Sequence, residues 1–184
     1  MITSYMNKIE VYNRSGNLSA KKKGTEIPVV LYGKINNENL NFSASITPEQ
    51  VDKLITSFGK RIFSVLIYVE FDKKEFKCLI KDIQFHPISE KVVHIDFQIL
   101  NNKQDVIVPV AINILNSSQA PFHKEGGILF TPQRRVNIKC NSDNIPEYIN
   151  CDVSTLHKGD KINTTDIDNI HFCKKHTLVT ILDK

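Results

Sequence analysis

The sequence is poor in the residues and motifs that usually reveal a function. Its 184 residues include no tryptophan and only four cysteines, and no two cysteines have the C-x-x-C spacing of zinc or redox motifs. We therefore expect free thiols, as in a cytoplasmic protein, although Cys140 and Cys151 could still be neighbours in space. The longest apolar run, residues 65–69, is far shorter than the roughly 20 residues that cross a bilayer. The N-terminus lacks the apolar segment of a secretion signal, and either Met1 or Met6 could be the start.

Motifs of catalysis are also missing. The chain has no G-x-S-x-G nucleophile turn, no P-loop and no dinucleotide-binding glycine pattern. Gly126 and Gly127 are adjacent, but two glycines before an apolar residue more simply mark a loop that enters a strand. One histidine and one aspartate two residues apart are an incomplete set of metal ligands. We therefore expect no enzymatic activity, no cofactor and no metal.

Positive charge is concentrated at the N-terminal end. Residues 1–34 carry six basic and two acidic side chains, a net charge of +4 that equals the net charge of the whole chain. Lysines occupy positions 21–23, and an apolar strand pattern follows that ends in Tyr32 and Gly33. Such a basic end indicates a polyanionic partner, with lysines at phosphates and Tyr32 against a base or sugar. A solvated lysine run, with Tyr32 in the core, is the alternative interpretation.

Most of the chain has the composition of β-strands. Segments rich in Val, Ile, Phe and Thr are separated by clusters of Asn, Asp, Lys, Gly and Pro. Short strands at this spacing predict a barrel or a sandwich and not βαβ units. Besides the apolar segment 27–33, the strands that we expect are 65–71, 76–85, 92–100, 106–115, 136–140 and 177–182.

One helix is clearly indicated after residue 46. Thr47, Pro48 and Gln50 form a capping-box pattern with proline at the first helical position. An apolar face at helical spacing follows, formed by Val51, Leu54, Ile55 and Phe58, and Gly59 is the expected end. A shorter helix is possible over residues 18–23. The polar segment 101–105 is the expected boundary between domains 1–100 and 101–184.

The strand over residues 92–99 has two different faces. Period two puts Val93, Ile95, Phe97 and Ile99 on one face, and the other carries His94, Asp96 and Gln98. The apolar face suits a core, and the polar face presents donors and acceptors that suit base edges or ribose hydroxyls. An ordinary solvated strand face has the same pattern, so the pattern alone leaves both interpretations open.

Several motifs, in order along nearly the whole chain, resemble those of one family. Residues 79–87, LIKDIQFHP, and residues 93–97, VHIDF, are similar to its most characteristic run, D-[VI]-Q-x-H-P followed by H-[VI]-D-F. Residues 22–33 resemble its basic segment with I-P and Y-G, and residues 124–129, 144–149, 152–154 and 159–160 resemble its C-terminal domain. This family is the bacterial large-subunit ribosomal protein that binds 5S rRNA, in its long two-domain form, also called the general stress protein Ctc family.

The resemblance implies a β-barrel docked on 5S rRNA, with neighbouring large-subunit proteins and rRNA as further contacts. The second, β-rich domain would have no defined role. The RNA-contacting positions of the family carry over to Arg14, Lys22, Lys23, Tyr32, Lys81, His94 and Asp96. Two lysines here replace two arginines, which keeps the charge but loses the bidentate fork, and Glu26 stands where the family has a basic residue. An affinity below that of other members is therefore expected.

We thus predict a mostly β protein, with an N-terminal β-barrel carrying one or two short helices and a smaller all-β C-terminal domain. It would be a cytoplasmic, structural, RNA-binding component of the large ribosomal subunit, monomeric off the ribosome and without membrane contact. Two other functions stay open. An anticodon-recognition module has a similar barrel, because fold does not fix function, and would prefer transfer RNA. A stress or assembly protein would act through residues 128–136 and the C-terminal sheet, and would be absent from purified large subunits.

Overall fold

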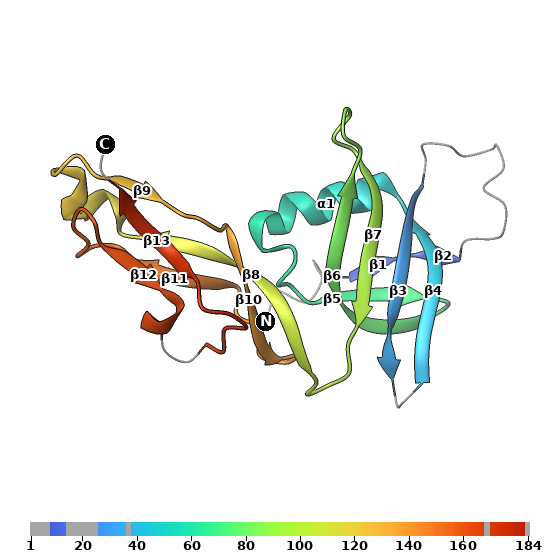
Figure 1. Ribbon diagram of the computed structural model, residues 1–184. Helices are drawn as coiled ribbons and strands as arrows, with labels where there is room; N and C mark the ends of the chain where they lie inside the picture. The colour runs from blue at the N-terminus through green and yellow to red at the C-terminus, as the bar shows by residue number, and fades with distance from the viewer. Residues whose placement is uncertain (1–7, 14–25, 36–37, 168–169, 183–184) are drawn as a thin grey trace. The chain divides into compact units, whose positions relative to one another are not determined.

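The structure, a computed structural model, describes residues 8–13, 26–35, 38–167 and 170–182. The chain divides into two compact units, residues 1–104 and residues 105–184. More than half of the described residues lie in strands, so the prediction of a mostly β protein is confirmed (Figure 1). In the part of the chain that is described, no helix combines the length and the apolar character that crossing a membrane requires.

The first unit contains one sheet and one α-helix. Its strands are β1 (Lys8–Glu10), β2 (Tyr12–Asn13), β3 (Ile27–Ile35), β4 (Glu38–Ile46), β5 (Ile67–Phe71), β6 (Lys74–Phe85) and β7 (Val92–Ile99). The helix α1 (Pro48–Phe58) continues directly into the short 3-10 helix η1 (Gly59–Arg61). The short helix expected over residues 18–23 lies outside the described residues.

One short segment nearly closes the sheet into the expected barrel. The strand order is β1-β5-β6-β7-β3-β4-β2, so β1 and β2 lie at opposite edges. In the chain, only Val11 separates them; β1 pairs with β5, β2 pairs with β4, and Val11 N donates to Glu70 O over 3.0 Å. The same six residues, 8–13, therefore pair with both sides of the sheet, with two residues of β4 and three of β5.

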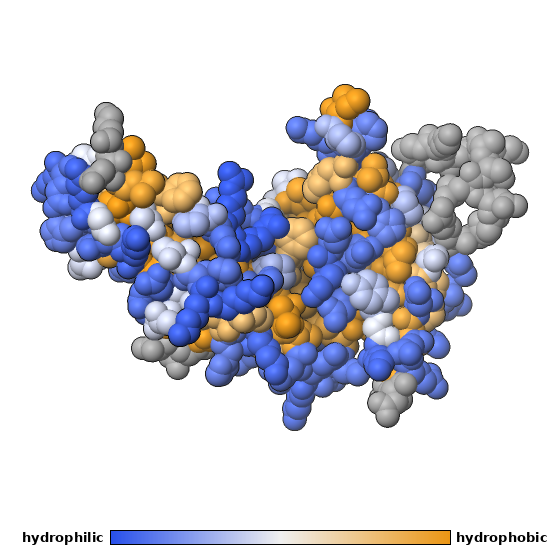
Figure 2. Space-filling model, in the orientation of Figure 1, coloured by the Kyte–Doolittle hydropathy of each residue, from blue (hydrophilic) through white to orange (hydrophobic). Residues whose placement is uncertain are grey.

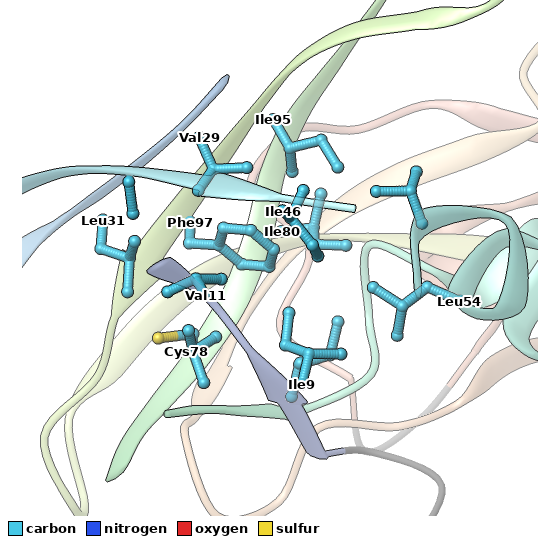
Figure 3. Close-up of a cluster of buried hydrophobic side chains, with 14 of the residues drawn as sticks. Ile9, Val11, Val29, Leu31, Ile46, Leu54, Cys78, Ile80, Ile95 and Phe97 are labelled. Atoms are coloured by element: carbon cyan, nitrogen blue, oxygen red, sulfur yellow. The ribbon is translucent and has the colours of Figure 1, made fainter. Parts of the chain in front are cut away.

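The barrel interior is filled by the apolar faces of its strands. Leu31, Ile46, Ile80, Ile95 and Phe97 are each at most 1% exposed and belong to one cluster (Figure 3). The helix α1 adds Leu54 to this cluster, as its apolar spacing predicted. Burial of these side chains, each contributing roughly 1.5–3 kcal/mol, holds the strands in place and leaves their other faces available for function.

The start and end of α1 agree with the sequence, but its capping does not. Gly59 ends the helix with a φ of 48°, and its N–H bonds to Ile55 O. The predicted capping box is wrong: Thr47 Oγ1 donates to Gln50 Oε1 over 3.1 Å instead of accepting from the backbone. The two side chains satisfy each other, and the Thr47 carbonyl accepts from the N–H groups of Gln50 and Val51.

Gly33 is required where β3 and β7 pair. It lies opposite Ile99 in a parallel ladder. A Cβ at position 33 would lie 2.6 Å from Ile99 O and 2.8 Å from Ile99 Cβ, closer than real atoms approach. The Tyr-Gly dipeptide thus allows two strands of the polar outer face to come together.

The second unit contains two three-stranded sheets with the orders β10-β8-β11 and β12-β13-β9. Their strands are β8 (Asp105–Leu115), β9 (Ile128–Phe130), β10 (Arg135–Asn141), β11 (Tyr148–Asp152), β12 (Lys161–Asn163) and β13 (Thr177–Leu182). The 3-10 helices are η2 (Ser117–Gln119), η3 (Pro121–His123) and η4 (Thr164–Asp166). Gly126 has a φ of 75° and Gly127 directly precedes β9, so the glycine pair does mark a loop that enters a strand.

The cysteines have no partner in either unit. All four are free. Cys140 lies opposite Val106 and Cys151 lies beside Ile114, eight residues further along β8, so these two thiols are not neighbours. No group of three potential metal ligands occurs among the described residues.

Candidate nucleic-acid interface

The polar row predicted on β7 lies on the outer face of the barrel. Ile95, Phe97 and Ile99 are buried as expected, whereas Val93, expected on the same face, is exposed where the strand leaves the core. His94, Asp96 and Gln98 are half-exposed. The side chains of His94 and Asp96 are 26% and 31% exposed, so both can be reached by a ligand. The rigid core behind this strand holds the polar row in a defined position.

The neighbouring strands β3 and β6 add further polar side chains to this face, among them the predicted residue Tyr32. On β3, Tyr32 lies beside Gln98 of β7, on the side opposite the buried Leu31. On β6, Gln84 lies opposite His94 and Asp82 lies opposite Asp96. Tyr32 is therefore an outer-face residue, and its interpretation as a core side chain is wrong.

A β-bulge in β6 brings Lys81 to the same face. The register of β6 against β7 shifts between Ile80 and Asp82, so Lys81 is the extra residue. As a result Lys81 and Asp82 are both exposed, between the buried residues Ile80 and Ile83. Simple alternation along this strand would have placed Lys81 and Asp82 on opposite sides of the sheet.

Two carboxylates control the electrostatics of the face. Asp96 Oδ1 lies 3.0 Å from His94 Nδ1, a contact that is an ion pair only when the imidazole is protonated. This Nδ1 is buried and has no hydrogen-bond partner among the described residues. Burial, followed by the charges of Asp96 and Asp82, raises the pKa of the Tyr32 hydroxyl above its ordinary value.

The described part of the face is mixed in charge, not basic. Arg14, Lys22 and Lys23, the residues expected to hold phosphates, lie outside the described residues. Glu26, the acidic residue that departs from the family pattern, accepts a hydrogen bond from Ser45 Oγ over 3.0 Å. This bond directs the carboxylate to the neighbouring strand β4.

Sequence reasoning missed Asp82 and Gln84 as members of this surface. A usable signal was present in β6, where the buried positions change from Cys78 and Ile80 to Ile83, a step of three. A step of three among buried strand residues indicates a bulge, and the two residues inside it share the outer face.

Both units match models of known protein families. Residues 9–97 match the Ribosomal L25p family, and residues 105–183 match the model for the C-terminal domain of ribosomal protein TL5. A large ribosomal subunit protein bL25 from Wolbachia sp. subsp. Brugia malayi (strain TRS) is 34% identical over 153 residues, which are 81% of this chain and 70% of the relative. The chain belongs to the ribosomal L25p family.

Other relatives within the L25p family give the same result. The bL25 protein of Porphyromonas gingivalis is 33% identical over 83% of this chain and 74% of its own length. That of Anaplasma marginale (strain Florida) is 35% identical over 83% of this chain and 68% of its own length. These matches confirm the resemblance found in the sequence. Because L25p proteins are structural ribosomal components, they also confirm that the chain is not an enzyme.

Proposed function

We propose that this L25p protein is a cytoplasmic, structural component of the large ribosomal subunit that binds 5S rRNA through its first unit. The relatives are named as large-subunit proteins, which supports the ribosomal role. The observation that carries the RNA-binding part is the outer face of β3, β7 and β6. It combines an aromatic hydroxyl, an imidazole, amides, carboxylates and one lysine on three adjacent strands.

This face has the chemistry of selective RNA recognition. Carboxylates repel phosphates but accept hydrogen bonds from base amino groups and ribose hydroxyls, so Asp82 and Asp96 favour a specific placement of the RNA. The hydroxyl of Tyr32 can donate to the same kind of ligand. Arg14, Lys22 and Lys23 supply the nonspecific attraction to phosphates, which positions the complex without reading it.

Substitution of Asp96 tests this assignment. We expect Asp96→Ala to weaken binding of 5S rRNA by roughly 1–3 kcal/mol, because hydrogen bonds to a charged group are lost. Binding of a random RNA of equal length should stay unchanged or become slightly tighter, because a phosphate-repelling charge is removed. Both RNAs are titrated at one salt concentration, after thermal melting has shown that the variant folds.

The matched control is Asp72→Ala, which removes an exposed carboxylate in the turn between β5 and β6. It changes the net charge by the same amount and should leave the preference for 5S rRNA intact. An equal loss for cognate and random RNA in Asp96→Ala would show that Asp96 has only a structural role.

A further inference from the structure

A second surface of the first unit has a different chemistry from the proposed RNA face. A cleft of about 730 Å³ opens between the start of β3, the first turns of α1 and the hairpin that joins β6 to β7. In Figure 1 this hairpin projects beyond the rest of the sheet. Among the described residues of the proposed RNA face, none lines the cleft or belongs to the tip of the hairpin.

The hairpin carries an unusual amount of exposed apolar surface. Phe85 is 52% exposed, Ile88 is 89% exposed and Val93 is 40% exposed. Phe85 and Val93 line the cleft, together with Ile55 of α1. Figure 2 shows hydrophobic surface at the tip of this hairpin. Single exposed apolar residues are normal, but several on one projecting element beside a cleft indicate an interaction surface.

The hairpin tip is held in shape by its own hydrogen bonds. His86 N donates to Lys91 O over 2.8 Å, and Glu90 N donates to His86 O over 2.9 Å. The His86 ring accepts at Nδ1 from the backbone N–H groups of Ile88 and Ser89, each over 3.3 Å. Ile88 is therefore exposed by a closed turn, and a partner would meet a preformed surface with little ordering cost.

The charges around the cleft favour a cationic partner. Its lining includes three carboxylates, Glu26, Asp52 and Glu90, and one lysine, Lys91. Because the carboxylates outnumber the lysine, the cleft repels the phosphates of RNA and attracts positively charged groups. The combination of an apolar lining with an acidic rim suits a peptide in which apolar and basic side chains alternate or cluster.

We propose that this cleft and the hairpin tip bind a short basic segment of another protein, with one or two apolar anchors. The anchors would pack against Phe85, Val93 and Ile88, and lysine or arginine side chains would lie at Asp52 and Glu90. This surface has no residue in common with the face formed by Tyr32, Lys81, His94 and Asp96, so the two proposals can be tested separately.

Site-directed photocrosslinking tests the proposal in the full chain. A benzophenone amino acid replaces Ile88, whose exposure makes the change harmless to the fold, and intact cells are irradiated. The expected product is a crosslink to a protein segment of net positive charge, identified by mass spectrometry of the joined peptides. A crosslink to RNA, to a second copy of this chain or to a neutral or acidic segment overturns the proposal, as does the absence of any crosslink.

Charge reversal provides the second measurement. Asp52→Lys with Glu90→Lys should lower the crosslink yield roughly tenfold or more, since like charges across an interface cost at least the ~1.4 kcal/mol that this factor represents. The matched control, Glu38→Lys with Asp72→Lys, adds the same charge outside the cleft. Each pair also includes one residue with a positive φ, Glu90 at 55° or Asp72 at 48°, so any backbone strain from the substitution is matched as well. An equal loss of yield in both pairs contradicts the proposal.

Both charge-reversal pairs are also titrated with 5S rRNA. The two pairs should bind it equally, because they have the same net charge and leave the outer face of β7 intact. A chain that binds no 5S rRNA but still crosslinks through Ile88 refutes the RNA proposal alone. A chain that binds 5S rRNA but gives no crosslink refutes the inference about the cleft alone.

Discussion

Asp82 and Asp96 lie directly opposite each other on two paired strands. Like charges at such positions destabilise a sheet by up to about 1 kcal/mol, so the pair reduces stability. The charges of the same two carboxylates add to burial in raising the pKa of the Tyr32 hydroxyl. A surface that keeps an unfavourable charge pair among hydrogen-bonding groups is typical of a binding site, where the ligand supplies the missing donors.

Two lysines in the N-terminal basic segment should contribute to affinity without contributing to specificity. We expect Lys22→Ala with Lys23→Ala to weaken binding to 5S rRNA and to random RNA alike. The log–log slope of affinity against salt concentration should fall by about 0.7–0.9 for each phosphate contact that is lost. Titrations at several salt concentrations measure this slope. If it stays the same, the lysines are solvated and do not contact the RNA.

A pair of charged residues makes the second unit sensitive to pH. Glu125 Oε1 lies 2.7 Å from His157 Nδ1, and Lys158 N donates to Glu125 Oε2 over 2.9 Å. The hydrogen bonds from Lys158 N and from His157 lower the pKa of Glu125. The hydrogen bond to Glu125, and the negative charge of this carboxylate, raise the pKa of His157. The histidine contribution to stability is full below its unfolded-state pKa of about 6.5 and is lost as the pH rises through the higher folded value.

His157→Ala should therefore lower the melting temperature more at about pH 6 than at about pH 9, because the contribution of the charged imidazole is lost as the pH rises through its raised pKa. Melting curves at the two pH values measure the difference. His171→Ala, which removes an exposed histidine outside this pair, is the control. A loss of equal size at both pH values would mean that His157 stabilises by packing and not by charge.

At the scale of the elements, the RNA face depends on how β6, β7 and β3 pair. The bulge in β6 aims Lys81 and Asp82 outward together, and the parallel ladder between β3 and β7 sets Tyr32 beside Gln98. Gly33 is the position at which this ladder tolerates no side chain, because Ile99 O would lie 2.6 Å from a Cβ. Since the contact involves backbone, relief requires the strands to move apart.

Gly33→Ala should lower the free energy of unfolding by roughly 1–3 kcal/mol, as overpacking of a tight site does. It should also weaken 5S rRNA binding, because Tyr32 moves with its strand. Urea denaturation and RNA titration measure the two effects. Lys34→Ala, at the next and exposed position of β3, should change stability by no more than about 0.5 kcal/mol. A Gly33→Ala protein as stable as Lys34→Ala would show that the ladder can adjust.

At the scale of the whole molecule, the proposed RNA residues all belong to the first unit. Arg14, Lys22 and Lys23 lie there in sequence, and the described residues of the face lie on its barrel. The second unit has its own buried residues, among them Val108, Ile138, Ile149 and Leu178, and so its own core. We therefore assign 5S rRNA binding to the first unit and leave the second unit without a role in it.

A fragment of residues 1–104 should bind 5S rRNA with most of the affinity of the full chain, and a fragment of residues 105–184 should not bind it. Titration of both fragments and of the full chain at one salt concentration measures this. A first fragment that binds ten times more weakly, a loss of about 1.4 kcal/mol, would make the second unit part of the RNA site.

Local patterns were sufficient for the helix α1, for seven of the thirteen described strands and for the family. The helix α1 follows from its apolar spacing, its proline and Gly59, and the two faces of β7 follow from period two, because both signals depend only on near neighbours in the chain. The motifs around His86 and His94 identified the L25p family. Strand β4 was not predicted, because its polar residues hide the weak alternation of Leu40, Phe42, Ala44 and Ile46.

Tertiary structure decided which residues meet. The closure of the barrel by residues 8–13 and the opposition of Asp82 to Asp96 depend on pairing between distant segments, which no local pattern encodes. The step from Ile80 to Ile83 indicates a bulge within β6, but only the pairing with β7 places Lys81 and Asp82 beside its polar row. The cleft beside the hairpin arises where three separate elements pack. Composition and periodicity determine which face of a strand is apolar, but only long-range pairing determines what lies next to it.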